Sequence, residues 1–299
     1  MLLIRVQNAI ERNKYMRDYV IFSDSGTDIS PAKAKELGVQ IIDLLVIMNG
    51  ETKLNREVDP KEFYAFLRDK GMATTSAVNL DAFTEAMESV VNEGKDILYL
   101  GFSSGLSTTY NAGKLAAEEL SEKYPDAKIY AVDTLCASLG QGLLVYLATK
   151  KKAEGATIDE LRDYIESIKL NLCHWFTVDD LMFLKRGGRV GAASAAVGTV
   201  LGIKPVMHVD NEGHLIKRGT ARGRKNSLDS LFDKMKASVT DTSVMWICHG
   251  DCIEDAEYLA ARAKEELGVK EVFIDYTGVV IGCHSGPGTL AIFYLGTER

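Results

Sequence analysis

Residues 96–134, DILYLGFSSGLSTTYNAGKLAAEELSEKYPDAKIYAVDT, decide the fold class. The stretch begins with an apolar strand, DILYLGFSS, continues through a helix over TYNAGKLAAEELSEKY, and ends with a second strand, AKIYAVDT. A helix between two strands lets the chain cross back before the second strand begins, so that the two strands run parallel. The stretch therefore predicts a βαβ unit in a parallel sheet that helices cover.

The alternation continues on both sides of this unit. Residues 19–25, YVIFSDS, predict a strand, and Ser30 and Pro31 predict the N-cap and first turn of the next helix. Residues 39–48, VQIIDLLVIM, predict a single buried strand. Further helices are predicted over residues 61–71, 80–94, 141–155 and 157–171.

The second half of the chain has a different pattern. Two helices separated by a glycine turn are predicted in residues 177–202, and a hairpin that turns at 211–213 is predicted in residues 203–222. The remaining predicted elements are a helix from Ser227, a helix over 255–268, and strands over 243–250, 271–277 and 288–295. We therefore predict two α/β domains with a ligand between them: residues 1–170, with a mostly parallel sheet, and residues 171–299, with the hairpin.

Composition excludes several classes of protein. The net charge of −7 argues against binding along a nucleic-acid backbone, so we expect no nucleic-acid partner. The longest apolar run, residues 41–48, contains Asp43 and is too short to cross a bilayer. The first 18 residues lack the apolar core of a signal peptide, and we expect them to form a short helical extension.

The cysteines predict a reducing environment. There are five, an odd number, and they are scattered through apolar segments, which favours reduced thiols in the cytoplasm. Cys248, His249 and Cys252 in CHGDC have the residue types of a metal site, but no second pair of ligands stands at a suitable spacing. We expect neither a metal nor a cofactor.

Four polar turns in the first half share one form. Three of them, 23–30, 101–109 and 132–138, follow a predicted strand and precede a helix, and TTSAVN at 74–79 also precedes a helix. Ligands bind at the carboxyl edge of open parallel sheets, and helix N-termini favour anions. For any single turn, helix capping is the better explanation, because Ser, Thr and Asp are the commonest capping residues. Four together favour a shared site, which Ser23, Asp24 and Ser25 would help to line.

Two features of the second half point to the same chemistry. Gly187 and Gly188 in FLKRGGRV allow a tight turn that projects Arg189, and a guanidinium suits carboxylate or phosphate. A C-capping glycine followed by a surface arginine explains the motif equally well. His284 interrupts an apolar, strand-like segment, and the turn around Gly286 lets backbone approach a ligand closely. A buried core histidine is the alternative.

One motif favours an enzyme instead. GFSSG matches G-x-S-x-G with Ser103 at its centre, between a predicted strand and helix, as in the nucleophile elbow of serine hydrolases. Asp251 and His284 follow in the matching order. No second oxyanion-hole motif accompanies them, so a serine esterase remains the competing hypothesis.

Together, these segments resemble one family. SDSGTDIS, TTSAVN, SSGLSTTYNA, VDT, FTVDDLMFLKRGGRV, GIKPVM, GTARGRKNSL and HSGPGTLAIFY occur in the order seen in the DegV family of bacterial fatty-acid-binding proteins. The resemblance runs from about residue 19 to residue 296. It implies two α/β domains with a long-chain fatty acid between them and the acyl tail in an apolar tunnel. It also implies that the fatty-acid carboxylate meets Thr75, Ser76, Ser103 or Ser104, Arg189 and His284.

The resemblance further implies a carrier and not an enzyme. The family's partner is a separate kinase that phosphorylates the bound fatty acid to an acyl phosphate for lipid synthesis. We expect the small residues of GAASAAVGTVLG, 191–202, to line the tunnel. A basic cluster around residues 217–225 stands out on an acidic chain, and we expect Arg222 and Arg224 to contact the kinase or, transiently, an anionic membrane.

Overall fold

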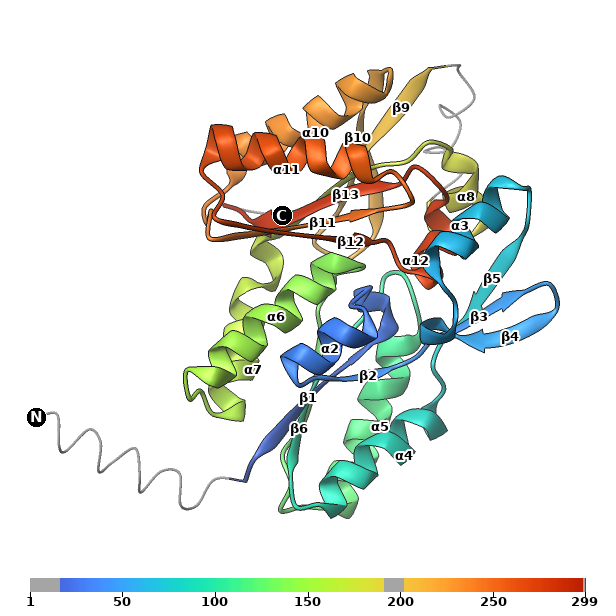
Figure 1. Cartoon of the computed structure of the whole chain (residues 1–299). Helices are drawn as coiled ribbons and strands as arrows, with labels where there is room; N and C mark the ends of the chain where they lie inside the picture. Colours follow the sequence, from blue (N-terminus) through green and yellow to red (C-terminus); the bar gives the residue numbers. More distant parts are fainter. Residues whose placement is uncertain (1–16, 191–201, 298) are drawn as a thin grey trace, which may run out of the picture.

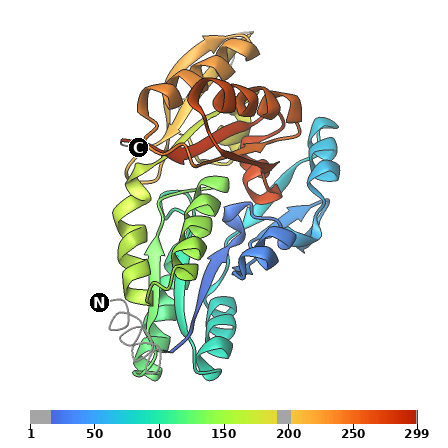
Figure 2. The same cartoon turned by 60° about the vertical axis from the view of Figure 1, so that its left-hand side comes forward.

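The computed structural model describes residues 17–190, 202–297 and 299. The expected N-terminal extension and nearly all of the small-residue segment 191–202 lie outside these residues. The chain forms two lobes, one above the other in Figures 1 and 2, each built around its own sheet. In the described part of the chain, no helix is long and apolar enough to cross a membrane.

The first lobe contains the predicted parallel sheet. Its four strands, in the order β2-β1-β6-β7, are all parallel. Their bounds are β1 Tyr19–Asp24, β2 Gln40–Ile42, β6 Asp96–Gly101 and β7 Ile129–Asp133. The helices of this lobe are α2 Pro31–Leu37, α4 Leu80–Asn92, α5 Thr109–Lys123, α6 Leu139–Ala153 and α7 Ile158–Ile168. The predicted caps are present: Ser30 Oγ accepts from Lys33 N, and Pro31 opens α2.

A small antiparallel sheet was not predicted. Its strands are β3 Leu45–Met48, β4 Glu51–Leu54 and β5 Ala73–Ser76, in the order β4-β3-β5, and α3 Pro60–Arg68 connects the last two in sequence. The single strand predicted over residues 39–48 is therefore two strands in two sheets. It breaks at Asp43, whose carboxylate pairs with Arg56, while the N–H of Leu44 donates to Ser25 Oγ.

The second lobe contains a six-stranded sheet in the order β10-β9-β8-β13-β11-β12. β11 and β12 are parallel, and the other neighbours are antiparallel. Its strands are β8 Leu172–Thr177, β9 Ile203–Val209, β10 Leu215–Arg222, β11 Val244–His249, β12 Glu271–Tyr276 and β13 Leu290–Leu295. Its helices are α8 Leu181–Arg186, α10 Arg224–Ser238, α11 Ile253–Leu267 and α12 Val279–Ser285. The hairpin of β9 and β10 turns where the sequence predicts.

Three parts of this lobe differ from prediction. Strand β8 was not predicted, and α10 begins at Arg224, three residues before Ser227. The third difference affects the site, because the segment before His284 is the helix α12 and not a strand. A short apolar run fits either structure by periodicity alone.

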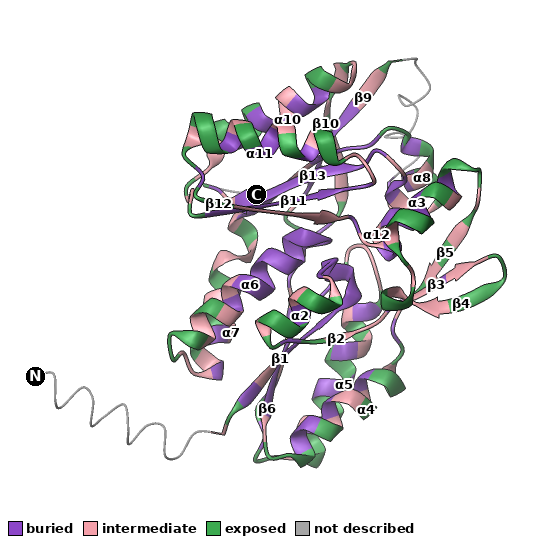
Figure 3. Cartoon of the chain, viewed as in Figure 1, coloured by how far each residue is buried: buried purple, intermediate pink, exposed green. Residues whose placement is uncertain are grey.

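Helices from both lobes enclose the second sheet. Helices α10 and α11 pack on one face through residues such as Leu231, Phe232 and Leu259. Helix α6 belongs to the first lobe in sequence, but its side chains share a core with Trp246 and Phe293 of the second sheet. Most of α6 is buried, as Figure 3 shows. The six-stranded sheet begins at Leu172, close to the boundary predicted at residue 170, which stays a prediction.

Candidate functional site

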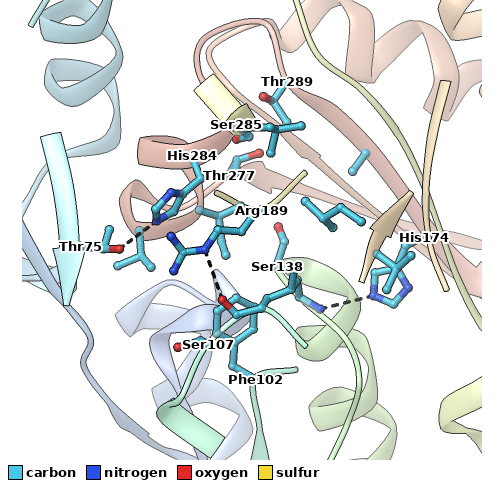
Figure 4. Close-up of a pocket in the computed structure, with 18 of the residues that line it drawn as sticks. Thr75, Phe102, Ser107, Ser138, His174, Arg189, Thr277, His284, Ser285 and Thr289 are labelled. Atoms are coloured by element: carbon cyan, nitrogen blue, oxygen red, sulfur yellow. Dashed lines mark hydrogen bonds between the residues drawn. The ribbon is translucent and has the colours of Figure 1, made fainter. Parts of the chain in front are cut away.

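A cavity of about 610 Å³ lies between the two lobes. This is within the range of about 300–1,000 Å³ that small-molecule sites occupy. The first lobe contributes the β6–α5 and β7–α6 turns and strand β5, and the second lobe contributes strands of its sheet and helix α12 (Figure 4). Its apolar lining includes Phe102, Leu106, Phe176, Leu184, Val209, Leu215, Val280, Ile281 and Phe293.

A hydrogen bond across the lobes marks one side of the cavity. Thr75 on β5 and His284 in the last turn of α12 are 2.9 Å apart, from Oγ1 to Nε2 (Figure 4). A glycine makes room for the ring, because a Cβ at Gly187 would lie 2.2 Å from His284 Nδ1. The φ of Gly187 is −71°, so steric space and not backbone freedom requires glycine here.

Arg189 supplies a cation to this side of the cavity. Its Nε donates to Leu106 O at 3.3 Å, and Nη1 donates to Gly187 O. The side chain is half-buried, and burial lowers its pKa from the ordinary value. In the described part of the chain Arg189 forms no ion pair, and no Asp or Glu is among the described residues that line the cavity. An anion is therefore the complement that the lining lacks.

His284 is neutral at pH 7. Burial, and secondly the charge of Arg189, lower its pKa to about 4. A neutral imidazole can donate one hydrogen bond and accept another, but it adds no charge. Arg189 thus provides the charge of the site, and His284 with Thr75 provides directional hydrogen bonds.

The structure separates the two adjacent serines. Ser104 is exposed and lines the cavity, and its N–H donates to Asp133 Oδ1 at 3.3 Å. Ser103 is fully buried and lies outside the lining; its hydroxyl donates to Gly213 O at 2.9 Å and accepts from Gly105 N at 3.2 Å. The cavity thus brings together Thr75, Ser76, Ser104, Arg189 and His284, but not Ser103.

Comparison with known proteins identifies the family. The family model described as "Uncharacterised protein, DegV family" matches residues 18–297. The chain belongs to the DegV family. A DegV domain-containing protein of Clostridium perfringens is 47% identical over 289 residues, which are 95% of this chain and 99% of that protein. A DegV domain-containing protein of Lactococcus lactis is 33% identical over 94% of this chain and 98% of its own length.

Solved structures of DegV proteins share the two-domain α/β fold. A fatty-acid-binding DegV family protein from Thermus thermophilus superposes with a TM-score of 0.83 at 28% identity, covering 93% of this chain and 99% of that chain. A Thermotoga maritima protein with a fatty-acid-binding function has a TM-score of 0.80 at 27% identity, covering 93% and 98%. A fatty-acid-binding DegV family protein from Streptococcus agalactiae has a TM-score of 0.80 at 26% identity, covering 95% and 100%. The DegV resemblance and the two-domain prediction are thereby confirmed.

Four predicted lining residues of this DegV chain are not in the cavity wall. Ser23, Asp24 and Ser25 are buried, and their side chains bond within the first lobe: Ser23 to Leu100 O, Asp24 to four donors, and Ser25 to Leu44 N. Gly286 ends α12 with a φ of 78°, and a Cβ there would lie 2.5 Å from the Phe183 ring. These residues secure turns and do not face the cavity.

The cavity also contains polar residues that the sequence did not single out. They are Ser107, Thr108, Ser138, His174, Thr277, Ser285 and Thr289. Ser107, Thr108 and Ser138 lie in the polar turns, so their sequence signal was present but not assigned to individual residues. Thr277 precedes α12 and Ser285 is its last residue, and the prediction of a strand there gave the wrong direction for their side chains.

The serine-esterase arrangement is not assembled in the described part of the chain. The Ser103 hydroxyl donates to a backbone carbonyl, His284 bonds to Thr75, and Asp251 forms an ion pair with Arg68. A nucleophilic serine needs a base within hydrogen-bonding reach. Ser103, Asp251 and His284 are therefore engaged elsewhere and do not form a relay.

The two arginines predicted to contact a partner differ. Arg222 ends the edge strand β10, is exposed, and forms no ion pair within the described residues. Arg224 is half-buried, and its Nε lies 2.8 Å from Asp255 Oδ2. Arg218 is also exposed in β10, at a β-bulge between Lys217 and Gly219. The exposed basic surface of this DegV protein therefore includes Arg218 and Arg222, while the charge of Arg224 is compensated.

Proposed function

We propose that the chain binds a long-chain fatty acid between its lobes, with the carboxylate at Arg189, His284 and Thr75. The observation that carries the proposal is a half-buried guanidinium, without an ion pair in the described part of the chain, on the wall of a mainly apolar cavity. A fatty acid supplies both the missing anion and an apolar tail. The solved DegV proteins of Thermus thermophilus, Thermotoga maritima and Streptococcus agalactiae, which bind fatty acids, support this assignment.

The tail provides most of the binding free energy. Removing a sixteen-carbon chain from water is favourable by about 12 kcal/mol, at about 0.8 kcal/mol per methylene. Ordering the chain and losing its free motion offset a large part of this. Micromolar or tighter binding is still expected, and the apolar side chains of Phe102, Phe176 and Phe293 provide the contact surface.

The head group sets the orientation of the ligand. A carboxylate buried without partners would lose several kcal/mol of hydration or take up a proton. Arg189 offers charge, and Thr75, Ser76 and Ser104, which also line the cavity, offer hydroxyls for hydrogen bonds. Ser104, and not Ser103, is the serine we assign to the carboxylate, because the Ser103 hydroxyl is already bonded to Gly213 O.

On this proposal the protein is a carrier, and a separate fatty acid kinase phosphorylates the carboxylate that it presents. The exposed cations Arg218 and Arg222 are the proposed contact with that kinase or, transiently, with an anionic membrane. Replacing both by Glu should lower acyl-phosphate formation by the kinase while fatty-acid affinity stays normal. Unchanged phosphorylation would contradict this contact. The matched variant Arg224→Gln should instead affect stability, because Arg224 pairs with Asp255.

We also propose that the protein works in the reducing environment of the cytoplasm. No disulfide joins the five cysteines, all of which lie in the described part of the chain, and four of them are buried. Burial raises the pKa of Cys136 to about 11 and that of Cys248 to about 12, so both are inert thiols at neutral pH.

Mass spectrometry of lipid extracted from the purified protein tests the proposed function. We expect one long-chain fatty acid per chain in the wild type and much less in Arg189→Met. Absence of fatty acid, together with no binding of added fatty acid in solution, would refute the proposal. Cleavage of a chromogenic acyl ester with a burst, and labelling of Ser103 by a serine-directed phosphonate, would favour the esterase instead.

A further inference from the structure

The cavity has a second set of polar side chains, apart from the proposed head-group site. Ser138, Cys248, Thr277 and Ser285 all line it, and each is 5% exposed or less. They come from the β7–α6 turn, strand β11, and the two ends of α12. An alkyl chain cannot form hydrogen bonds with hydroxyls in the cavity wall. Buried hydroxyls are unfavourable when they are left without partners.

Ser138 and Thr277 lie between the two ends of the cavity. Figure 4 shows the Thr75–His284 pair on one side of the cavity and His174 on the other, with Ser138 and Thr277 between them. His174 packs edge-on against Phe293, with ring centroids 5.3 Å apart. A chain that starts at Arg189 and ends against Phe293 therefore passes these hydroxyls.

Two of the hydroxyls have unused hydrogen-bonding capacity. Thr277 Oγ1 and Ser285 Oγ have no oxygen or nitrogen hydrogen-bond partner within the described residues. The polar neighbour of Thr277 is the Cys248 thiol, a weak hydrogen-bonding group. Buried polar atoms are normally satisfied, and each exception in a cavity wall points to a ligand or water that completes it.

Ser138 adds a third hydroxyl, held in a strained conformation. Its φ of 56° and ψ of −149° lie in a region that only glycine adopts readily. Its N–H donates to Gly26 O at 2.7 Å, and its hydroxyl contacts the Asp28 carboxyl and lies 3.2 Å from Cys248 Sγ. Such strain persists where the surrounding structure imposes it, and it concentrates at binding sites.

Asp28 orients this hydroxyl to accept a hydrogen bond from a ligand. Burial raises the pKa of Asp28 to about 8, and the charge of Asp275 adds to the effect. The Ser138 hydroxyl donates its hydrogen to Asp28 Oδ2. The Ser138 oxygen keeps lone pairs that can accept a hydrogen bond from a ligand hydroxyl.

We infer that Ser138, Thr277 and Ser285 form a subsite for an oxygen atom on the acyl chain, so that the protein prefers a hydroxylated long-chain fatty acid to the plain acid of the same length. This inference rests on the proposed fatty-acid function and deepens it. A plain chain covers the three hydroxyls with methylene groups and gives Thr277 and Ser285 no oxygen partner. A hydroxyl on the ligand offers one donor and two acceptors at the same place.

Competition binding tests the inference. Stearic acid and a series of hydroxystearic acids, with the hydroxyl at successive chain positions, displace a fluorescent fatty acid from the full chain. We expect one positional isomer to bind about tenfold more tightly than stearic acid, the gain that one or two neutral hydrogen bonds provide. The other isomers should bind more weakly, because their hydroxyl is buried against apolar wall.

Three variants test which side chains cause the preference for a hydroxylated acid over stearic acid. Thr277→Val is isosteric, and Ser138→Gly removes the hydroxyl and also relieves the backbone strain. Both variants should reduce the preference for the hydroxylated acid to within twofold, while stearic acid still binds. Thr177→Val is the matched control, because Thr177 Oγ1 is equally buried and without a partner in the described chain but lies outside the cavity lining. The control should keep the full preference.

The possible failures are distinguishable. If no isomer binds more tightly than stearic acid, or if the preference survives in both Thr277→Val and Ser138→Gly, the subsite is refuted and bound water is the occupant of these hydroxyls. If neither stearic acid nor any isomer binds, the proposed fatty-acid function fails as well.

Discussion

Two polar clusters of this protein look alike in sequence and differ in what they do. The cluster around Asp24 and Ser103 and the cluster around Arg189 and His284 are both rich in hydrogen-bonding groups in or near polar turns. In the first, which we call the closed cluster, the bonds are made within the protein: Asp24 accepts from four donors and Ser103 donates to Gly213 O. In the second, the open cluster, Arg189 has no carboxylate partner in the described chain.

The difference shows that residue type predicts where polar chemistry gathers, but not whether its capacity is already used. A satisfied cluster stabilises the fold, and an unsatisfied one next to a cavity binds a ligand. Substitutions in the closed cluster should therefore change stability and leave binding intact, and substitutions in the open cluster should do the reverse.

The largest effect is expected at Asp24. Asp24→Ala leaves the N–H groups of Gly26 and Phe102 and the hydroxyl of Tyr99 without their acceptor inside the core. We expect the free energy of unfolding to fall by at least about 3 kcal/mol, measured by urea denaturation. Asp233→Ala, on the exposed side of α10, is the control and should change it by less than about 0.5 kcal/mol.

The comparison requires that fatty-acid affinity per folded molecule stay within about twofold of the wild type in Asp24→Ala, which corresponds to less than about 0.4 kcal/mol. A much larger loss of affinity would mean that the closed cluster belongs to the binding site after all.

Arg189→Met tests the open cluster in the opposite sense. The substitution keeps an apolar stem but removes the charge that faces the carboxylate. We expect fatty-acid affinity to fall about 100-fold, as for loss of one partner of a buried charge pair. The free energy of unfolding should change by less than about 1 kcal/mol, because within the described residues the guanidinium bonds to just two groups, the backbone carbonyls of Gly187 and Leu106.

Isothermal titration with a C16 fatty acid measures this loss, and Arg222→Met is the exposed control, expected to bind normally. Wild-type affinity in Arg189→Met would show that the hydroxyls alone hold the head group, and would remove the main contrast between the clusters.

Adjacent glycines give a finer test. A Cβ at Gly187 would lie 2.2 Å from His284 Nδ1, whereas a Cβ at Gly188 meets nothing within 4 Å. Gly187→Ala should displace the His284 ring from Thr75 and weaken fatty-acid binding about tenfold, the worth of a hydrogen bond of this kind. Gly188→Ala should cost about 1 kcal/mol of stability, because its φ is 71°, and should leave binding nearly intact.

Equal binding by the two alanine variants would contradict the steric role of Gly187. In that case the position of the His284 ring does not control recognition of the carboxylate.

The fold was predictable where signals are local. The residues that mark the start of a helix after a strand, such as Ser30 and Pro31 before α2, are adjacent in sequence. These local signals predicted the parallel sheet. The antiparallel sheet was missed because the chain breaks at Asp43, whose partner Arg56 lies 13 residues away. The segment of helix α12 was predicted to be strand-like, because its seven residues, six of them apolar or small and the other His284, show no decisive periodicity.

The sequence predicted which residues gather at the site, but not whether their hydrogen bonds are already made within the protein. Thr75, Ser104, Arg189 and His284 were all expected, and the structure places them on one cavity. Ser103 could not be separated from Ser104 in sequence, because its hydroxyl is satisfied by Gly213, 110 residues further along the chain. Such long-range pairing is a property of the folded structure alone.

The smallest expected effect concerns pH and distinguishes the charge of Arg189 from the hydrogen bond of His284. Without ligand, the pKa of His284 is about 4, because burial and Arg189 oppose the imidazolium. A bound carboxylate stabilises the protonated form, so binding should raise this pKa toward its ordinary value. Between the two pKa values binding takes up a proton, and affinity should therefore fall as pH rises through the bound-state pKa.

Titrating the His284 ring by NMR in the free and bound protein measures both pKa values. Comparing the wild type with His284→Gln between pH 5 and pH 7.5 isolates its contribution, because the protonation of the fatty acid itself is common to both. We expect the wild-type affinity to change a few-fold more than that of the variant over this range, less than about 1 kcal/mol. If affinity changes with pH equally in the wild type and in His284→Gln, the bound carboxylate does not interact with His284. Arg189 and the hydroxyls then hold the head group without it.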